Sequence, residues 1–167
     1  MRAPALLRFW GLPVLALAPL LWLAGCGFHM QGRIELPRSL ANARIEASDQ
    51  QSDFYISLRA ALYAAGSRLD GTAPDAATIR ILADSTSERI LTVSVRNTPT
   101  AFALSYRVKV AVEYQGRELL PAEEHTLTRE YSFNETELLA KQRESDILRQ
   151  ALAADLAALV TRRLAAL

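Results

Sequence analysis

Few residues of this 167-residue chain have the types and spacing that catalysis or metal binding requires. His29 and His125 are the only histidines and lie far apart, and Cys26 is the only cysteine, so no set of zinc ligands is recognisable. No serine stands in a nucleophile elbow, and no glycine-rich loop could hold a phosphate. Glu123 and Glu124 follow Pro121 closely, where we expect a solvated turn. We therefore expect no metal, no cofactor and no enzymatic activity, although a catalytic group assembled only in space stays open.

The chemistry that the sequence does indicate is at Cys26, which ends an apolar N-terminal segment. Two arginines precede an uncharged stretch from Phe9 to Leu23, and small residues lie directly before the cysteine. Two prolines interrupt the stretch, and a bilayer-spanning helix needs about 20 consecutive apolar residues, so a cleaved signal is favoured over a transmembrane anchor. Leu23-Ala24-Gly25-Cys26 resembles the lipobox of bacterial lipoproteins. The resemblance implies that Cys26 becomes the first residue of the mature chain and carries acyl groups.

This assignment divides the chain into a signal peptide at 1–25, a lipidated tether at 26–40 and one domain at 41–167. Gly27 follows the cysteine where an aspartate would be the familiar signal for inner-membrane retention, so we expect sorting to the periplasmic side of the outer membrane. Loss of Arg2 and Arg8 changes the formal net charge from +1 to −1. A near-neutral domain does not bind nucleic acid electrostatically. A lipidated Cys26 leaves no thiol for a disulfide, so packing must stabilise the domain.

The periodicity of the apolar residues predicts the elements of this domain. Alternation predicts strands at 43–47, 79–83, 91–95, 102–114 and 125–133, with a polar stretch at 85–88 between the second and the third. Spacings of three and four residues predict one helix from Phe54 to a stop at Gly66. A second helix is predicted after Asn134, which resembles a capping box with Glu137.

The long strand gives the clearest pattern, because its apolar residues occupy the even-numbered positions from 102 to 114. We expect this face to be buried and the opposite face, which carries Arg107 and Lys109, to be wetted or in contact with something polar. The order of the elements predicts an α+β fold, with two helices packed on one face of a roughly four-stranded, mainly antiparallel sheet.

Several short motifs share their order and spacing with one known family. The mature chain would begin Cys26-Gly27-Phe28-His29-Met30-Gln31-Gly32, followed by Leu36-Pro37. Further motifs are Arg96-Asn97 at a strand end, the long alternating strand, Tyr131-Ser132-Phe133, and Leu139-Ala140-Lys141 with Asp146 ahead of the last helix. Together these resemble the LPS-assembly lipoproteins of the LptE family. The resemblance covers essentially the whole mature chain.

The resemblance implies an outer-membrane lipoprotein that is not an enzyme. It implies that the domain lies as a plug inside the LptD β-barrel translocon, helps that barrel assemble, and binds lipopolysaccharide during insertion into the outer leaflet. Arg96 and Lys141 match family positions implicated in lipopolysaccharide binding, where their charges would meet lipid A phosphates. Arg107 and Lys109 would offer polar surface to the barrel lumen, which polar side chains line. Ordinary surface charge is the alternative for all four residues.

Two other functions stay open from the sequence. The first is a stand-alone periplasmic lipid carrier, which needs an apolar cavity that Phe102, Tyr106 and Tyr114 could line. The second is a structural lipoprotein of another envelope complex.

Overall fold

A computed structural model describes residues 34–69, 71, 73–132 and 138–167, with the side chains of 138–141 excepted. Residues 34–167 form one unit. Cys26 and the predicted capping pair Asn134 and Glu137 lie outside the described residues. The elements follow one another as η2 (Arg38–Leu40), β1 (Ala43–Ala47), α2 (Asp53–Ala64), β2 (Ala77–Val93), β3 (Pro99–Tyr114), β4 (Arg117–Ser132) and α3 (Leu138–Ala165).

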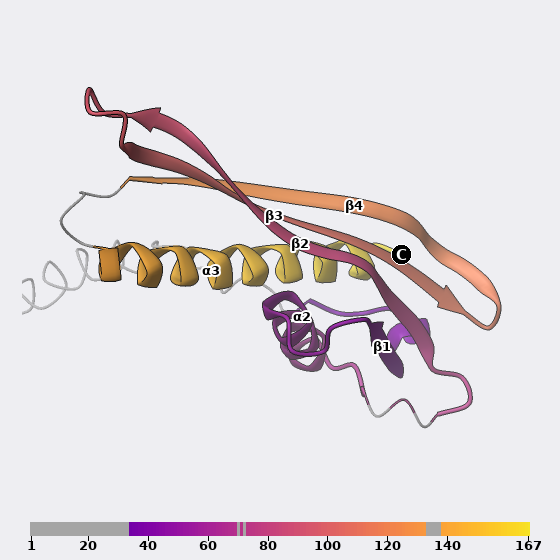
Figure 1. The fold of residues 1–167 in the computed structure, drawn as a ribbon. Helices are drawn as coiled ribbons and strands as arrows, with labels where there is room; N and C mark the ends of the chain where they lie inside the picture. Colours follow the sequence, from indigo (N-terminus) through magenta and orange to yellow (C-terminus); the bar gives the residue numbers. More distant parts are fainter. Residues whose placement is uncertain (1–33, 70, 72, 133–137) are drawn as a thin grey trace, which may run out of the picture. The chain divides into compact units, whose positions relative to one another are not determined.

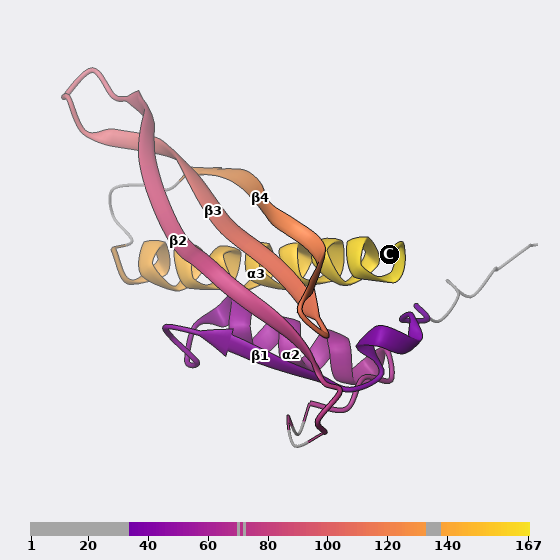
Figure 2. The same ribbon diagram turned by 90° about the vertical axis from the view of Figure 1, so that its right-hand side faces the viewer.

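The four strands form one open sheet in the order β1-β2-β3-β4. β1 pairs with β2 in parallel, and β2, β3 and β4 form an antiparallel meander. Neighbouring parallel strands need a crossover connection, which α2 provides. Both helices cover the same face of the sheet (Figures 1 and 2). The predicted fold class is therefore confirmed.

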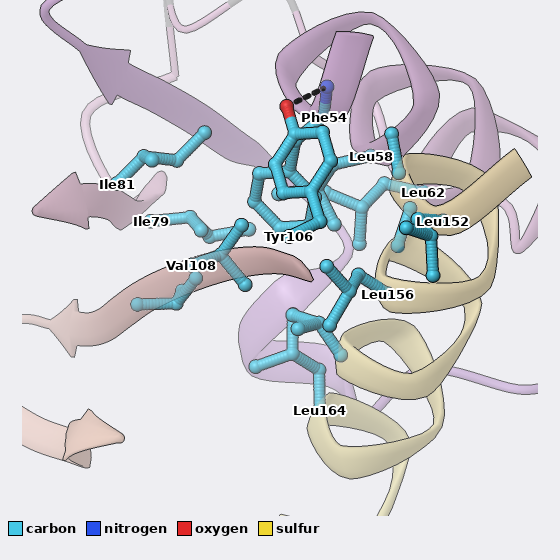
Figure 3. Close-up of a cluster of buried hydrophobic side chains, with 14 of the residues drawn as sticks. Phe54, Leu58, Leu62, Ile79, Ile81, Tyr106, Val108, Leu152, Leu156 and Leu164 are labelled. Carbon is cyan, nitrogen blue, oxygen red and sulfur yellow. Dashed lines mark hydrogen bonds between the residues drawn. The ribbon is translucent and has the colours of Figure 1, made fainter. Parts of the chain in front are cut away.

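The core lies between this sheet face and the two helices (Figure 3). β3 buries every even-numbered residue from Phe102 to Val112, as its alternation predicts, and Tyr114 is half-buried. α2 contributes Phe54, Leu58 and Leu62, and Leu40 just ahead of the predicted domain start is also fully buried. The buried stripe of α3 consists of Leu152, Ala153, Leu156, Ala157, Val160 and Leu164.

A polar network fixes the start of α2 against the sheet. Ser52 caps the helix, because its hydroxyl accepts from the Tyr55 amide at 3.1 Å and donates to Asp84 of β2 at 2.5 Å. The Tyr106 hydroxyl accepts from the Phe54 amide at 3.3 Å (Figure 3). Burial, followed by the hydrogen bond and charge of Asp84, raises the pKa of Tyr106 well above its ordinary value. The first turn of α2 therefore has defined partners on both β2 and β3.

The predicted helix stop at Gly66 is confirmed. Gly66 has φ 93°, a conformation that glycine adopts without strain. Its amide donates to Tyr63 O at 3.0 Å, and the Ser67 amide donates to Leu62 O at 3.0 Å. This pair of bonds is the Schellman arrangement that satisfies the last carbonyls of a helix.

β2 differs from its prediction, because the predicted strand at 79–83 and residues 91–93 of the predicted strand at 91–95 belong to one strand that continues through the polar residues 85–88. This strand ends at Val93, so Val95 lies in the turn that follows. A register shift between Ile81 and Ala83 turns Asp84 toward the helices. Asp84 meets Ser52 there, and Glu88 accepts a hydrogen bond from Tyr131 of β4 at 2.6 Å. These partners lie far away in the sequence, so the local polar composition suggested a break.

β4 also starts earlier than predicted. Gln115 and Gly116 both have positive φ, which is typical of a tight type I′ hairpin turn, and the strand begins directly afterwards at Arg117. The predicted turn at Glu123 and Glu124 was wrong, because both residues belong to the strand. Glu123 pairs with Arg163 of α3 at 2.7 Å, and that hydrogen bond holds the pKa of Glu123 below its ordinary value. The edge position of β4 explains how the strand tolerates Pro121.

Candidate functional site

The hairpin formed by β2 and β3 extends away from the two helices (Figures 1 and 2). Its turn is held by backbone bonds from the Ser94 amide to Thr98 O at 2.7 Å and from the Asn97 amide to Ser94 O at 2.9 Å. The Ser94 hydroxyl accepts from the Arg96 amide at 3.3 Å. Asn97 takes a left-handed conformation with φ 61°. The backbone of Arg96 is thus fixed in this turn while its side chain is exposed.

Several apolar residues of the same hairpin are exposed as well. Val95, next to Arg96, is fully exposed, and Val93 and Ile90 are each about half exposed, at 49% and 52%. Leu91 is 37% exposed. The alternation of 91, 93 and 95 is typical of a buried strand face, but the helices do not extend over this end of the hairpin (Figure 1). Exposed apolar groups beside a cation suit an amphiphile with an anionic head.

The first turns of α3, which contain Lys141, lie at the same end of the unit as the hairpin (Figures 1 and 2). The Lys141 side chain itself lies outside the described part of the structure. The two elements are connected through Tyr131 of β4, which stacks on Phe102 with a centroid distance of 5.5 Å and donates to Glu88. Burial, and then the hydrogen bond with Glu88, raises the pKa of Tyr131 to about 12, against a smaller opposite effect of Ser145 on α3.

The opposite face of the sheet carries Arg107 and Lys109, as the alternation of β3 predicts. Arg107 is exposed and Lys109 is half-buried, and neither has an ion-pair partner among the described residues. Arg107 lies in register between Ser85 and Thr126. Neighbouring residues are also hydroxylic, and the hydroxyls of Ser105 and Thr128 lie 2.8 Å apart. Around Arg107, this face therefore carries polar residues on all three antiparallel strands.

The structure also bears on two alternatives, a lipid-binding cavity and a metal site. Phe102 and Tyr106, which could have lined a lipid cavity, are 4% and 3% exposed and pack into the core. His125 lies on β4 with its Nε2 atom 3.8 Å from Glu123 Oε2. Within the described ranges, no three residues are grouped as a metal would require.

The hydrogen bond between Tyr131 and Glu88 and the exposure of the apolar hairpin residues were not predicted from the sequence. Glu88 gave no local signal, because its partner is on another strand. The only available signal for the hairpin was the apolar run ending next to Arg96. No helix in the part of the chain that the structure describes is long and apolar enough to cross a membrane.

Comparisons with known proteins identify relatives of this chain. Residues 40–164 match the family model described as "LptE: Lipopolysaccharide-assembly". The LPS-assembly lipoprotein LptE of Pectobacterium atrosepticum is 27% identical over 153 residues, which cover 90% of this chain and 82% of that protein. The LPS-assembly lipoprotein LptE of Yersinia pestis strain Pestoides F is 27% identical over 143 residues, covering 84% and 69% respectively.

Solved structures show the same fold. The solution structure of lipoprotein B from Nitrosomonas europaea has a TM-score of 0.68 at 26% identity, and covers 84% of this chain and 91% of that chain. The rare lipoprotein B from Shewanella oneidensis has a TM-score of 0.67 at 22% identity, with coverage of 75% and 94%. The match to the second structure supports the fold alone.

Proposed function

Since the chain belongs to the LptE family of lipopolysaccharide-assembly lipoproteins, which are not enzymes, we propose that its domain plugs the LptD β-barrel and binds lipopolysaccharide on its way to the outer leaflet. A role in lipopolysaccharide assembly follows from the family itself. Beyond this role, we propose where the domain lies, that it binds lipopolysaccharide, and which residues are responsible for each.

The observation that carries the binding proposal is the hairpin end. Arg96 is exposed on a rigid turn beside Val93 and Val95, and α3 begins at the same end with Lys141 in its first turns (Figure 1). Lipid A combines phosphates with acyl chains. A guanidinium and an ammonium group would bind the phosphates, and the exposed valines would contact the apolar part.

The polar face of the sheet supports the plug position. Arg107 and Lys109 lie on this face among hydroxylic side chains, and the helices leave it uncovered (Figure 2). The lumen of a large outer-membrane barrel is polar, so this face could lie against it without burying an unmatched apolar surface.

Attachment to the membrane is proposed at Cys26. Acyl groups on this residue would place the domain on the periplasmic side of the outer membrane, and the multiple chains of a bacterial lipoprotein anchor a protein durably. From Ile34 onward, where the structure describes the chain, Leu40 is the first fully buried residue, so we expect the fold not to depend on the lipid.

The binding proposal is tested by replacing Arg96 and Lys141 together. The neutral Arg96→Gln/Lys141→Gln variant is expected to lose up to about 30-fold in lipopolysaccharide affinity at low salt, from about 1 kcal/mol for each exposed ionic contact. The Arg96→Asp/Lys141→Asp variant adds repulsion and should bind several-fold more weakly still. Arg117→Asp/Arg162→Asp is the matched control, because it makes the same charge change at two exposed positions elsewhere in the domain. Equal binding by the two Asp variants would contradict the site.

The plug position is tested separately by affinity purification from detergent-solubilised outer membranes. Wild-type chain is expected to co-purify with one large barrel, and Arg107→Asp/Lys109→Asp to co-purify less while keeping the wild-type melting temperature. A lipid-loaded monomer without a barrel would instead support the carrier function.

A further inference from the structure

Helix α2 has a second apolar stripe that its packing does not use. The helix buries Phe54, Leu58 and Leu62 in the core. On its outer side, Arg59, Ala60 and Tyr63 lie three, four and seven residues after Ile56, which places all four on one face. Ile56 is 53% exposed and Tyr63 is 76% exposed.

This stripe forms one side of an open groove of about 830 Å³. The segment that follows the helix, with Arg68 and Leu69, contributes to its lining, together with Tyr55 and two glutamines before the helix. A smaller groove of about 290 Å³ shares Tyr55, Arg59 and Leu69 with it and continues toward β1. The two grooves therefore form one surface along α2.

The charge of this surface is positive. Arg59 and Arg68 are exposed, and neither forms an ion pair with any described residue, whereas Arg44, Arg149 and Arg163 all have carboxylate partners. The described residues that line the larger groove include no carboxylate. Two guanidinium groups beside tyrosines and an isoleucine are thus available to an anionic partner that also has an apolar part.

The groove lies beside the point at which the chain enters the domain. The Arg68 amide donates to Ala41 O at 2.8 Å, and the Ala43 amide donates to Arg68 O at 2.9 Å. Fifteen residues separate Cys26 from Asn42, the bridge partner of Arg68. Even fully extended, such a segment spans at most about 55 Å. A lipid on Cys26 would therefore keep this groove within about 55 Å of the membrane surface, so that it could reach the headgroups.

We infer that the outer groove of α2 docks on anionic phospholipid headgroups. Arg59 and Arg68 bind the headgroup phosphates, and Tyr63 and Ile56 enter the interfacial region, where tyrosine is a favoured residue. This docking would orient the anchored domain on its leaflet while it is outside the barrel. The inference rests on the proposed lipidation of Cys26, which would bring the membrane within reach. Its test uses a chain without the lipid, so failure of the docking and failure of the lipidation can be distinguished.

The experiment measures flotation of the mature chain with Cys26→Ser on phosphatidylcholine vesicles with and without phosphatidylglycerol. The chain should bind the anionic vesicles only, and added salt should release it. Arg59→Gln/Arg68→Gln should weaken this binding about 30-fold, since each arginine near an anionic surface contributes about fivefold. The control Arg117→Gln/Arg162→Gln loses the same charge at other exposed positions and should bind nearly as the parent does.

Three results would overturn the inference. The first is equal vesicle binding by the groove variant and the control. The second is absence of parent binding to anionic vesicles. The third is loss of barrel co-purification by the groove variant with its vesicle binding intact, which would assign the groove to a protein contact. Lipopolysaccharide binding by the groove variant should stay unchanged, because the groove contains neither Arg96 nor Lys141.

Discussion

A carboxylate placed on either face of β3 tests the register on which the whole fold depends. Val112 is 1% exposed, and its partners in register, Ile79 and Leu120, are fully buried apolar residues. Ala111, one position earlier, lies on the opposite face and pairs with Arg80. The same substitution at these neighbouring positions should therefore have very different effects.

The expected cost at Val112 has two parts. Loss of the buried valine side chain costs about 2 kcal/mol. The aspartate must also be neutralised at pH 7, and raising its pKa from about 3.9 to 7 costs about 4 kcal/mol. Val112→Asp should thus lose about 6 kcal/mol, against a total stability of about 5–15 kcal/mol for an ordinary domain. Ala111→Asp should change stability by less than about 1 kcal/mol, because its carboxylate stays near water and near Arg80.

Chemical denaturation followed by circular dichroism measures both variants at pH 7 and pH 4. The folded-state pKa of Asp at 112 is raised above the unfolded value, so its penalty is smallest below the unfolded pKa and grows as the pH rises. Val112→Asn serves as the neutral control, and its deficit should not depend on pH through this position. Equal stability of Val112→Asp and Ala111→Asp would show that the register of β3 is wrong.

Further measurements test the anchor, the hairpin and a helix end. Cys26→Ser should abolish lipidation. For the wild type, measurement of the intact mass should show a mature chain that begins at an acylated Cys26. Tyr131→Phe should cost about 1.5–3 kcal/mol by removing a hydrogen bond to the Glu88 carboxylate. The pKa of Tyr131 in the folded state is raised to about 12, so its contribution to the free energy of unfolding should be complete below pH 10 and be lost between pH 10 and 12. The melting temperature of Tyr131→Phe should therefore fall less than that of the wild type as the pH rises through this range. Gly66→Ala should lower the free energy of unfolding by about 1 kcal/mol, because φ is 93° at this position. No atom within 4 Å would contact the new methyl group, so steric overlap should add nothing. An unchanged melting temperature would argue against the left-handed cap.

The elements that the sequence predicted well are those whose pattern and burial coincide. β3 alternates strictly, and the even-numbered residues from Phe102 to Val112 are buried because both helices cover that face. α2 and α3 likewise bury the stripes that their spacing indicates. In these elements the local pattern and the tertiary contacts require the same arrangement.

Prediction failed where polar residues have distant partners. Asp84 and Glu88 lie inside β2, yet their composition suggested a loop, since Ser52 and Tyr131 are remote in the sequence. At the candidate site, the sequence indicated Arg96 but not the exposure of Val93 and Val95. Alternation shows which side chains share a face, and only the extent of the helices decides whether that face is covered.

The short pairing of β1 has a consequence for how the chain behaves when it is produced alone. β1 pairs with β2 only as far as Ala47 and Ile81, and no other described strand pairs with that edge of β2 as it continues to Val93. An extended strand with open amides and carbonyls is a template for another strand. Chains that accumulate with this edge uncovered should therefore aggregate edge to edge, and the three register shifts and the charges of Glu88 and Arg89 would slow this aggregation. The yield of soluble chain would then depend on how quickly this edge of β2 is covered.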